Sequence, residues 1–208
     1  MTRGKFIALE GGEGAGKSTQ ARLLAETLAA RGIEAVVTRE PGGTSGAEAI
    51  RALLLDADGA GWSPRAEALL FAAARSDHVE RLIRPALETG RWVICDRFVD
   101  SSRAYQGGAG GLEDREILAL HGIGSGGLLP DLTLLIEVSA DVAVARTARR
   151  DGGAADRIGG RDAGYHAAVA ATFRALADAD PGRFARIDGE GLVDETHALI
   201  LAAVDARC

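Results

Sequence analysis

Short apolar runs alternate along the chain with longer segments in which apolar side chains recur every three or four positions. The runs are typical of buried parallel strands, and the longer segments of helices with one apolar face. The predicted strands are residues 5–10, 35–38, 92–95, 132–138 and 183–188. The predicted helices are residues 17–30, 46–55, 64–83, 113–121, 140–148 and 194–206, with further helices starting near residue 100 and around residues 165–176.

This alternation of strand and helix predicts a five-stranded parallel sheet with helices on both faces, a three-layer α/β/α fold. The length of 208 residues favours a single domain over residues 1–208. Residues 147–161 are rich in Arg and Gly and lack a core pattern, so we interpret them as a mobile lid. Aromatic residues make up only 4% of the chain, which predicts a core of Ala, Leu, Val and Ile.

The charge and the apolar pattern limit the partners of the chain. A net charge of −6 argues against binding a nucleic-acid polyanion. No apolar run approaches the length of a membrane helix, and the first residues lack the pattern of a signal peptide, so we expect a cytoplasmic protein with no membrane partner.

Cys95 is predicted to be a buried thiol and Cys208 a tail thiol, with no disulfide framework. The scattered histidines are interpreted as ordinary surface or helix residues: His78, His121, His166 and His197.

The most specific motif lies between the first predicted strand and the helix that follows it. Residues 6–18 read FIALEGGEGAGKS and contain the Gly-x-x-x-x-Gly-Lys-Ser spacing of a phosphate-binding loop. Its glycines let backbone N–H groups converge on a phosphate, and the helix adds its partial positive charge. Lys17 would reach the outer phosphates, and Ser18 would ligate Mg²⁺. The expected nucleotide-binding residues are Gly11, Gly12, Glu13, Gly14, Ala15, Gly16, Lys17, Ser18 and Thr19.

Five further motifs follow in order along the chain. They are TREPGGT at 38–44, LFAAAR at 70–75, CDRF at 95–98, DSSRAYQG at 100–107 and PDLTL at 130–134. Together with the loop, they resemble the thymidylate kinase family from residue 6 to about residue 161. The resemblance implies the P-loop NTPase fold, transfer of the γ-phosphoryl group of ATP to dTMP, Mg²⁺ as cofactor, and a homodimer.

The resemblance also implies roles for individual residues at the acceptor phosphate and the metal. Arg97 and Arg51 would hold the phosphate of dTMP, and Asp96 would lie near Mg²⁺ together with Ser18. Lys17, Arg97 and Asp96 would thus form part of the catalytic set. From the residues alone, Arg97 could instead form a structural ion pair, Asp96 could cap the next helix, and Arg51 could lie on a solvated face.

A second group of residues is implied to bind the nucleoside of dTMP. Phe71 would stack on the base, Arg75 would donate to its edge, and Tyr105 would lie against the deoxyribose. The other implied dTMP contacts are Ser102 and Gln106 at the base, Glu13 near the 3′-OH, and Glu40. For Phe71 and Tyr105, simple packing in the core remains an alternative, and Glu13 could be a solvated loop charge.

The phosphate-binding loop carries no basic residue at positions 12–15, whereas the predicted lid is rich in arginine. This resembles the bacterial type of the family, in which lid arginines are catalytic. Arg150 is the first choice for the transition-state contact, and Arg146 would lie over adenine. The chain departs from the common family pattern at Phe98, where Tyr or His is more usual. The lid arginines are Arg146, Arg149, Arg150, Arg157 and Arg161.

Three other functions compete with this interpretation. The nearest is a kinase for another nucleoside monophosphate such as dUMP, CMP or AMP. A GTP-dependent switch requires an Asn-Lys-x-Asp motif, which a chain without asparagine cannot supply. A P-loop ATPase without a small acceptor would not need the polar set formed by Arg51, Phe71, Arg75, Arg97, Ser102 and Gln106.

Overall fold

The structure is a computed structural model that describes residues 3–56, 59, 61–151 and 157–208. Its sheet is parallel and has the strand order β2-β3-β1-β4-β5, so β1, which precedes the phosphate-binding loop, lies in the centre. This confirms the predicted three-layer α/β fold. The strands are Phe6–Glu10 (β1), Ala35–Arg39 (β2), Trp92–Asp96 (β3), Leu132–Glu137 (β4) and Phe184–Asp188 (β5).

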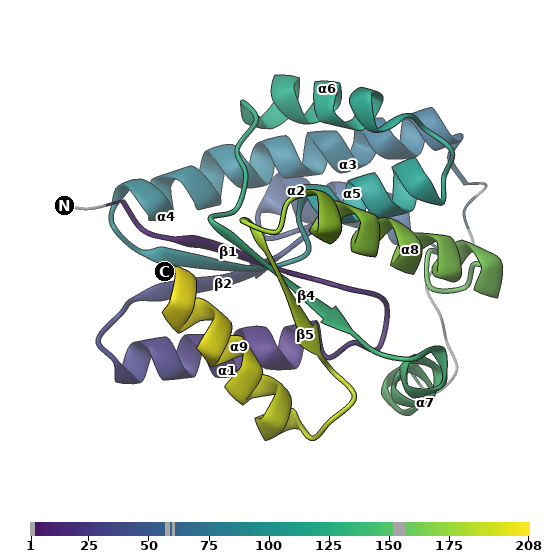
Figure 1. The fold of residues 1–208 in the computed structure, drawn as a ribbon. Helices are drawn as coiled ribbons and strands as arrows, with labels where there is room; N and C mark the ends of the chain where they lie inside the picture. Colours follow the sequence, from purple (N-terminus) through teal and green to yellow (C-terminus); the bar gives the residue numbers. More distant parts are fainter. Residues whose placement is uncertain (1–2, 57–58, 60, 152–156) are drawn as a thin grey trace.

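Helices cover both faces of the sheet (Figure 1). Lys17–Ala30 (α1) and Val193–Arg207 (α9) pack on one face, and Ala140–Asp151 (α7) lies beyond the end of β4. The other face is covered by Ser45–Leu55 (α2), Pro64–His78 (α3), Arg84–Glu88 (α4), Val99–Ser102 (α5), Asp114–Ser125 (α6) and Ala163–Ala179 (α8).

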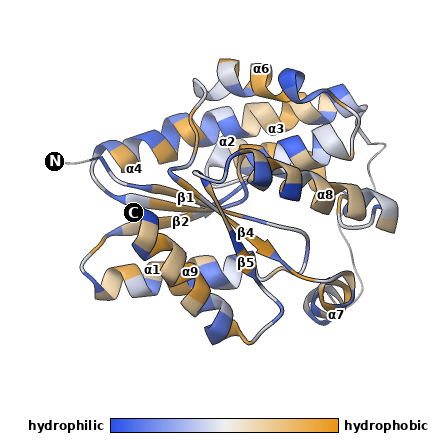
Figure 2. Cartoon of the chain, in the orientation of Figure 1, coloured by the Kyte–Doolittle hydropathy of each residue, from blue (hydrophilic) through white to orange (hydrophobic). Residues whose placement is uncertain are grey.

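The core is divided by the sheet into two sides. Ile7 and Leu9 of β1 point toward α1 and α9, while Phe6 and Ala8 point toward α4. All five residues of β1 are buried, which explains why the sequence shows a continuous apolar run there. In Figure 2, β4 carries the hydrophobic colour, whereas α4 and α6 show hydrophilic and hydrophobic patches around their circumference. Cys95 is buried and Cys208 exposed, as predicted.

Two segments contain a π-helical turn that the spacing of apolar residues in the sequence did not predict. The expected helix 64–83 continues through Val79–Ile83 (η1) into α4 and ends at Glu88, so Pro85 does not break it. Pro85 lies just after the π-helical turn η1, where the regular i→i−4 hydrogen-bond pattern is already interrupted, so its missing N–H does not break the helix. The second turn, Arg103–Gly108 (η2), follows α5.

The interpretation of the histidines as surface or ordinary helix residues holds for the helical positions of His78 and His121, but neither of the two lies at the surface. His78 is fully buried and lies between Thr38 and Glu40, and His121 is buried with Nε2 at 2.7 Å from the carbonyl of Leu128. Singly spaced histidines on helices gave no sign of these partners, because the partners are distant in sequence.

None of the described helices has the length and apolarity needed to cross a membrane.

Candidate active site

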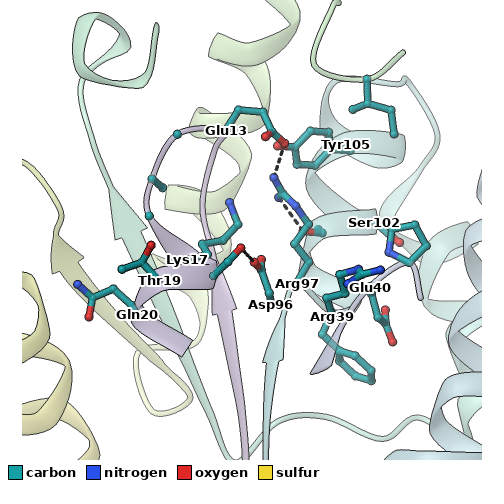
Figure 3. A pocket seen from close by; sticks show the side chains of 18 of the residues that line it. Glu13, Lys17, Thr19, Gln20, Arg39, Glu40, Asp96, Arg97, Ser102 and Tyr105 are labelled. Atoms are coloured by element: carbon teal, nitrogen blue, oxygen red, sulfur yellow. Dashed lines mark hydrogen bonds and ion pairs between the residues drawn. The ribbon is translucent and has the colours of Figure 1, made fainter. Parts of the chain in front are cut away.

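A cleft of about 740 Å³ lies at the carboxyl edge of the sheet, where β1, β2 and β3 end. Figure 3 shows side chains that point into this cleft from the loops after these strands and from the neighbouring helical segments. Its lining is more cationic than acidic, although the chain as a whole carries a net charge of −6. Such a lining favours an anionic ligand. The charged lining residues are Lys17, Arg39, Arg51, Arg75, Arg97 and Arg146, with Glu13, Glu40 and Asp96.

The phosphate-binding loop has the backbone that its motif requires. Gly11 has φ +140°, and a Cβ there would lie 2.3 Å from the carbonyl oxygen of Ile136 on β4. Gly16 has φ +90° and precedes α1, whose first turn has no side-chain cap. The first N–H groups of α1 are therefore not claimed by a side chain and face the cleft, as binding a phosphate requires.

Lys17 lies at the centre of this loop. Its Nζ donates to the carbonyl oxygens of Gly11 at 3.1 Å and Gly12 at 2.7 Å. Burial, together with the positive charge of Arg97, lowers the pKa of Lys17 to about 8. A phosphate anion beside this amine would favour its charged form.

Ser18 and Asp96 meet on the floor of the cleft. The hydroxyl of Ser18 donates to Oδ2 of Asp96 at 2.5 Å, and the side chain of Asp96 does not cap α5. A hydroxyl and a carboxylate beside a phosphate loop are the hard oxygen donors that Mg²⁺ takes along with water and substrate phosphates. Within the described residues there is no cluster of three His, Cys, Asp or Glu side chains that could hold a metal without such a substrate.

Arg97 projects from the end of β3 toward the loop (Figure 3). Its backbone is left-handed, with φ +71°. Its guanidinium donates to Glu13 at 2.6 Å and to the carbonyl of Gly11 at 3.0 Å, and it lies 5.0 Å from the ring centre of Tyr105. Arg97 is thus both an ion-pair partner and a lining residue, and it is placed beside the phosphate loop.

Sequence reasoning missed Glu10, which holds the turn that carries Arg97. Oε1 of Glu10 accepts from the backbone N–H groups of Phe98 at 2.8 Å and Ser101 at 3.1 Å, and Oε2 accepts from the Ser101 hydroxyl at 2.6 Å. These bonds fix the residues that directly follow the left-handed Arg97. Burial raises the pKa of Glu10 to about 7, with the nearby charge of Asp100 as the second cause.

This raised pKa makes the stability of the fold depend on pH. As pH rises from 4.5 to about 7, the unfolded Glu10 has lost its proton while the folded one still holds it, so each step of pH favours unfolding. We expect the free energy of unfolding to fall by about 3 kcal/mol over this interval, relative to Glu10→Gln. Urea unfolding of both proteins at several pH values measures the difference. A difference that is constant with pH would contradict the assignment.

A buried ion cluster supports Arg75 from behind. Its Nε donates to Oε2 of Glu40 at 2.7 Å and its Nη2 to the hydroxyl of Ser102 at 2.8 Å. Oε1 of Glu40 lies 3.0 Å from His78 Nδ1, and Thr38 lies 2.8 Å from the other ring nitrogen. The described contacts of Glu40 are therefore with protein groups that orient Arg75, and any contact with dTMP remains a prediction.

The remaining predicted acceptor residues also line the cleft. Phe71 is half-buried and packs against the cluster around Tyr105, so it has both a cleft side and a core side. The hydroxyl of Tyr105 is buried and has no hydrogen-bond partner among the described residues. Arg51 Nη1 donates to the carbonyl of Pro41 at 2.8 Å. Gln106 is almost fully buried and reaches the cleft from η2.

The lid arginines whose side chains the structure describes do not meet at one point. Arg146 lines the cleft and donates to the carbonyl of Gly191 at 3.3 Å, and Arg149 is exposed on α7. Arg157 bonds the carbonyls of Asp56 and Gly59, and Arg161 pairs with Glu67 at 2.5 Å. The side chain of Arg150 and residues 152–156 lie outside the described part of the chain.

The fold and the cleft define a class of protein. A phosphate-binding loop at the centre of a parallel sheet shares one cleft with a second polar pocket that contains Arg75 and Arg97. That arrangement belongs to P-loop phosphotransferases that act on a small anionic acceptor.

Comparison with known proteins identifies the family within this class. The family model of thymidylate kinase matches residues 9–200. The thymidylate kinase of Rhizorhabdus wittichii is 55% identical over 201 residues, covering 97% of each chain, and that of Nitrobacter winogradskyi is 48% identical over 99% of this chain and 90% of its own. The crystal structure of thymidylate kinase from Ehrlichia chaffeensis superposes with a TM-score of 0.79 at 32% identity, covering 98% of this chain and 99% of that one. The chain belongs to the thymidylate kinase family.

Proposed function

We propose that this chain transfers the γ-phosphoryl group of ATP to dTMP, forming dTDP and ADP for dTTP synthesis. The observation that carries the proposal is the shared cleft, in which the phosphate-binding loop faces Arg97 and the polar groups around Arg75. Family membership supports the same reaction. A P-loop ATPase without an acceptor would not need this second pocket.

In the proposed reaction an oxygen of the dTMP phosphate attacks the γ-phosphorus, and the bond to the β–γ bridging oxygen breaks as ADP leaves. The attacking oxygen is already anionic, so the site needs position and charge neutralisation more than a general base. The loop N–H groups and Lys17 hold the β- and γ-phosphates. Arg97, with Arg51, holds the acceptor phosphate in line, since a planar guanidinium grips two phosphate oxygens at once. Arg146 would lie over adenine.

Ser18 and Asp96 are the residues that would hold Mg²⁺, beside the phosphates on the loop. When bound, the ion neutralises phosphate charge. At the other end of the cleft, Phe71 would stack on the base, Arg75 and Gln106 would bond its edge together with Ser102, and Tyr105 and Glu13 would contact the sugar. Glu40 acts by holding Arg75 in place.

A coupled assay of ADP release with dTMP, dUMP, dCMP, CMP, UMP, AMP and GMP tests the proposal. We expect slow ADP formation without an acceptor, strong acceleration by dTMP, and the highest kcat/KM with dTMP. A preference for AMP or CMP would assign the cleft to another monophosphate kinase. ADP formation that no monophosphate accelerates would instead indicate an ATPase.

The lid arginine proposed for the transition state is Arg150. We expect Arg150→Ala to lower kcat by about 10- to 100-fold while the Kd for dTMP changes little, because the arginine would contact charge that develops only during transfer. Steady-state kinetics and dTMP titration measure the two effects. Arg149→Ala, which changes the exposed arginine directly before Arg150 on α7, is the matched control. An unchanged kcat in Arg150→Ala would place the catalytic arginine elsewhere in the lid.

We also propose that the protein is a cytoplasmic homodimer, with nucleotides as its small-molecule partners and neither nucleic acid nor membrane among them. Support for a dimer comes from exposed apolar side chains on three neighbouring helices, α3 and the two helices packed against it, α2 and α6. These are Leu53, Leu69, Leu118 and Ile123. Sedimentation velocity distinguishes a dimer from a monomer.

A further inference from the structure

Glu67 is a buried carboxylate that does not line the cleft. It lies in the first turn of α3, one helical turn before Phe71, and is 5% exposed. Its Oε1 accepts from Nε2 of Gln106 at 3.0 Å, and its Oε2 accepts from Arg161 at 2.5 Å. The side chain therefore joins α3, η2 and the end of the predicted lid, directly behind the wall of the base pocket.

This contact determines which way the amide of Gln106 points. A side-chain amide has a donor end and an acceptor end of nearly the same shape, and its orientation follows from its hydrogen-bond partners. Glu67 forms an ion pair with Arg161, and both of its carboxylate oxygens act as acceptors. Nε2 must therefore face Glu67, and Oε1 is left without a hydrogen-bond partner among the described residues. Gln106 consequently offers the cleft an acceptor.

Arg75 supplies the complementary group in the same part of the cleft. It bonds Ser102, which lies one turn before Gln106, and its Nη1 makes no hydrogen bond with the described residues. The pocket thus offers a donor from Arg75 beside an acceptor from Gln106. The edge of thymine presents the matching pair, an acceptor at O4 and a donor at N3–H. Cytosine presents the reverse pair, a donor at N4 and an acceptor at N3.

We propose that Glu67 is a positioning residue that sets the preference for thymine over cytosine by holding the amide of Gln106 with its oxygen toward the base. This rests on the proposed function, since it concerns the acceptor of that reaction. With Gln106 turned the other way, its Nε2 would donate to N3 of cytosine and oppose N3–H of thymine. A site that leaves a buried polar group unpaired rejects a substrate far more strongly than a change in apolar contact does.

The variant that tests this is Glu67→Gln, which can donate as well as accept and so releases the orientation of Gln106. We expect the ratio of kcat/KM for dTMP to kcat/KM for dCMP to fall by at least about tenfold. The ratio cancels losses common to both substrates, such as a weakened lid contact through Arg161. Glu116→Gln is the matched control: it removes an exposed ion pair with Arg65 and should leave the ratio unchanged.

A double-mutant cycle separates this role from a merely structural one. Gln106→Leu removes the acceptor and should itself lower the ratio, and Glu67→Gln should add no further change in that background. An unchanged ratio in Glu67→Gln would overturn the proposal. So would a fall caused by Glu67→Gln that is equally large in the wild-type and the Gln106→Leu backgrounds. If Glu67→Gln does not fold, an unchanged ratio in Gln106→Leu would overturn it. A wild-type protein that does not prefer dTMP to dCMP would contradict the proposed function, whatever the variants do.

Discussion

Lys17→Met is expected to lower kcat for phosphoryl transfer by about 10²- to 10³-fold. The amine lies on the phosphate loop, where it now donates to the carbonyls of Gly11 and Gly12 and would turn to the transferring phosphoryl group. Removing one preorganised charged donor from such a site costs about 10²–10³ in rate, and Lys17 donates to two carbonyls of the loop. Methionine has similar length, so the fold should persist. Single-turnover kinetics with saturating ATP measure the effect.

The same variant has two internal checks. The Kd for dTMP should stay within a few fold of the wild-type value, because in the proposed reaction the acceptor phosphate is held by Arg97 and Arg51. The pKa of Lys17, lowered to about 8, adds a pH signature: the amine loses its proton above this pH, so ATP binding by the wild type should weaken there. Lys17→Met should lack this weakening. A variant that retains most of the wild-type kcat would show that the loop is not the donor site.

Arg97→Lys is expected to lower kcat/KM for dTMP by about 10²-fold although it keeps the positive charge. Lysine cannot donate to Glu13 and grip two phosphate oxygens at once, as the guanidinium can. Lysine also does not bond to the Gly11 carbonyl in the same fixed geometry. The KM for ATP should change much less, because the loss lies on the acceptor side.

A matched substitution controls for the loss of an arginine as such. Arg31→Lys at the end of α1 removes the two-point guanidinium contact with the exposed Asp205, far from the cleft, and should leave both constants near wild type. If Arg97→Lys affects the KM for ATP more than that for dTMP, Arg97 belongs to the donor side and the acceptor phosphate is held elsewhere.

The parts of the site that the sequence predicted are those with local signatures. Lys17 and Ser18 follow glycines at a fixed spacing, and Asp96 and Arg97 come directly after an apolar run, at the edge where parallel strands bind ligands. The strands β1 and β4 were equally clear, because strands buried on both faces form uninterrupted apolar runs.

The parts that were missed depend on contacts between distant segments. Glu10 bonds residues 88 and 91 positions later, and Glu67 bonds residues 39 and 94 positions later. His78 is paired with Glu40, 38 positions earlier. Nothing local distinguishes such buried carboxylates and imidazoles from solvated ones. The π-helical turns were missed for a similar reason, because an extra residue in a helical turn is stabilised by tertiary packing and leaves the apolar spacing almost unchanged.

The central claim is that one cleft brings the γ-phosphate of ATP to the phosphate of dTMP. Incubation with ATP labelled with ³²P at the γ-position, with and without dTMP, followed by separation of the products, tests it most directly. We predict that label enters dTDP in equal amount to the ADP formed, and that little inorganic phosphate appears. Label that is released as inorganic phosphate at the same rate with or without dTMP would contradict the claim.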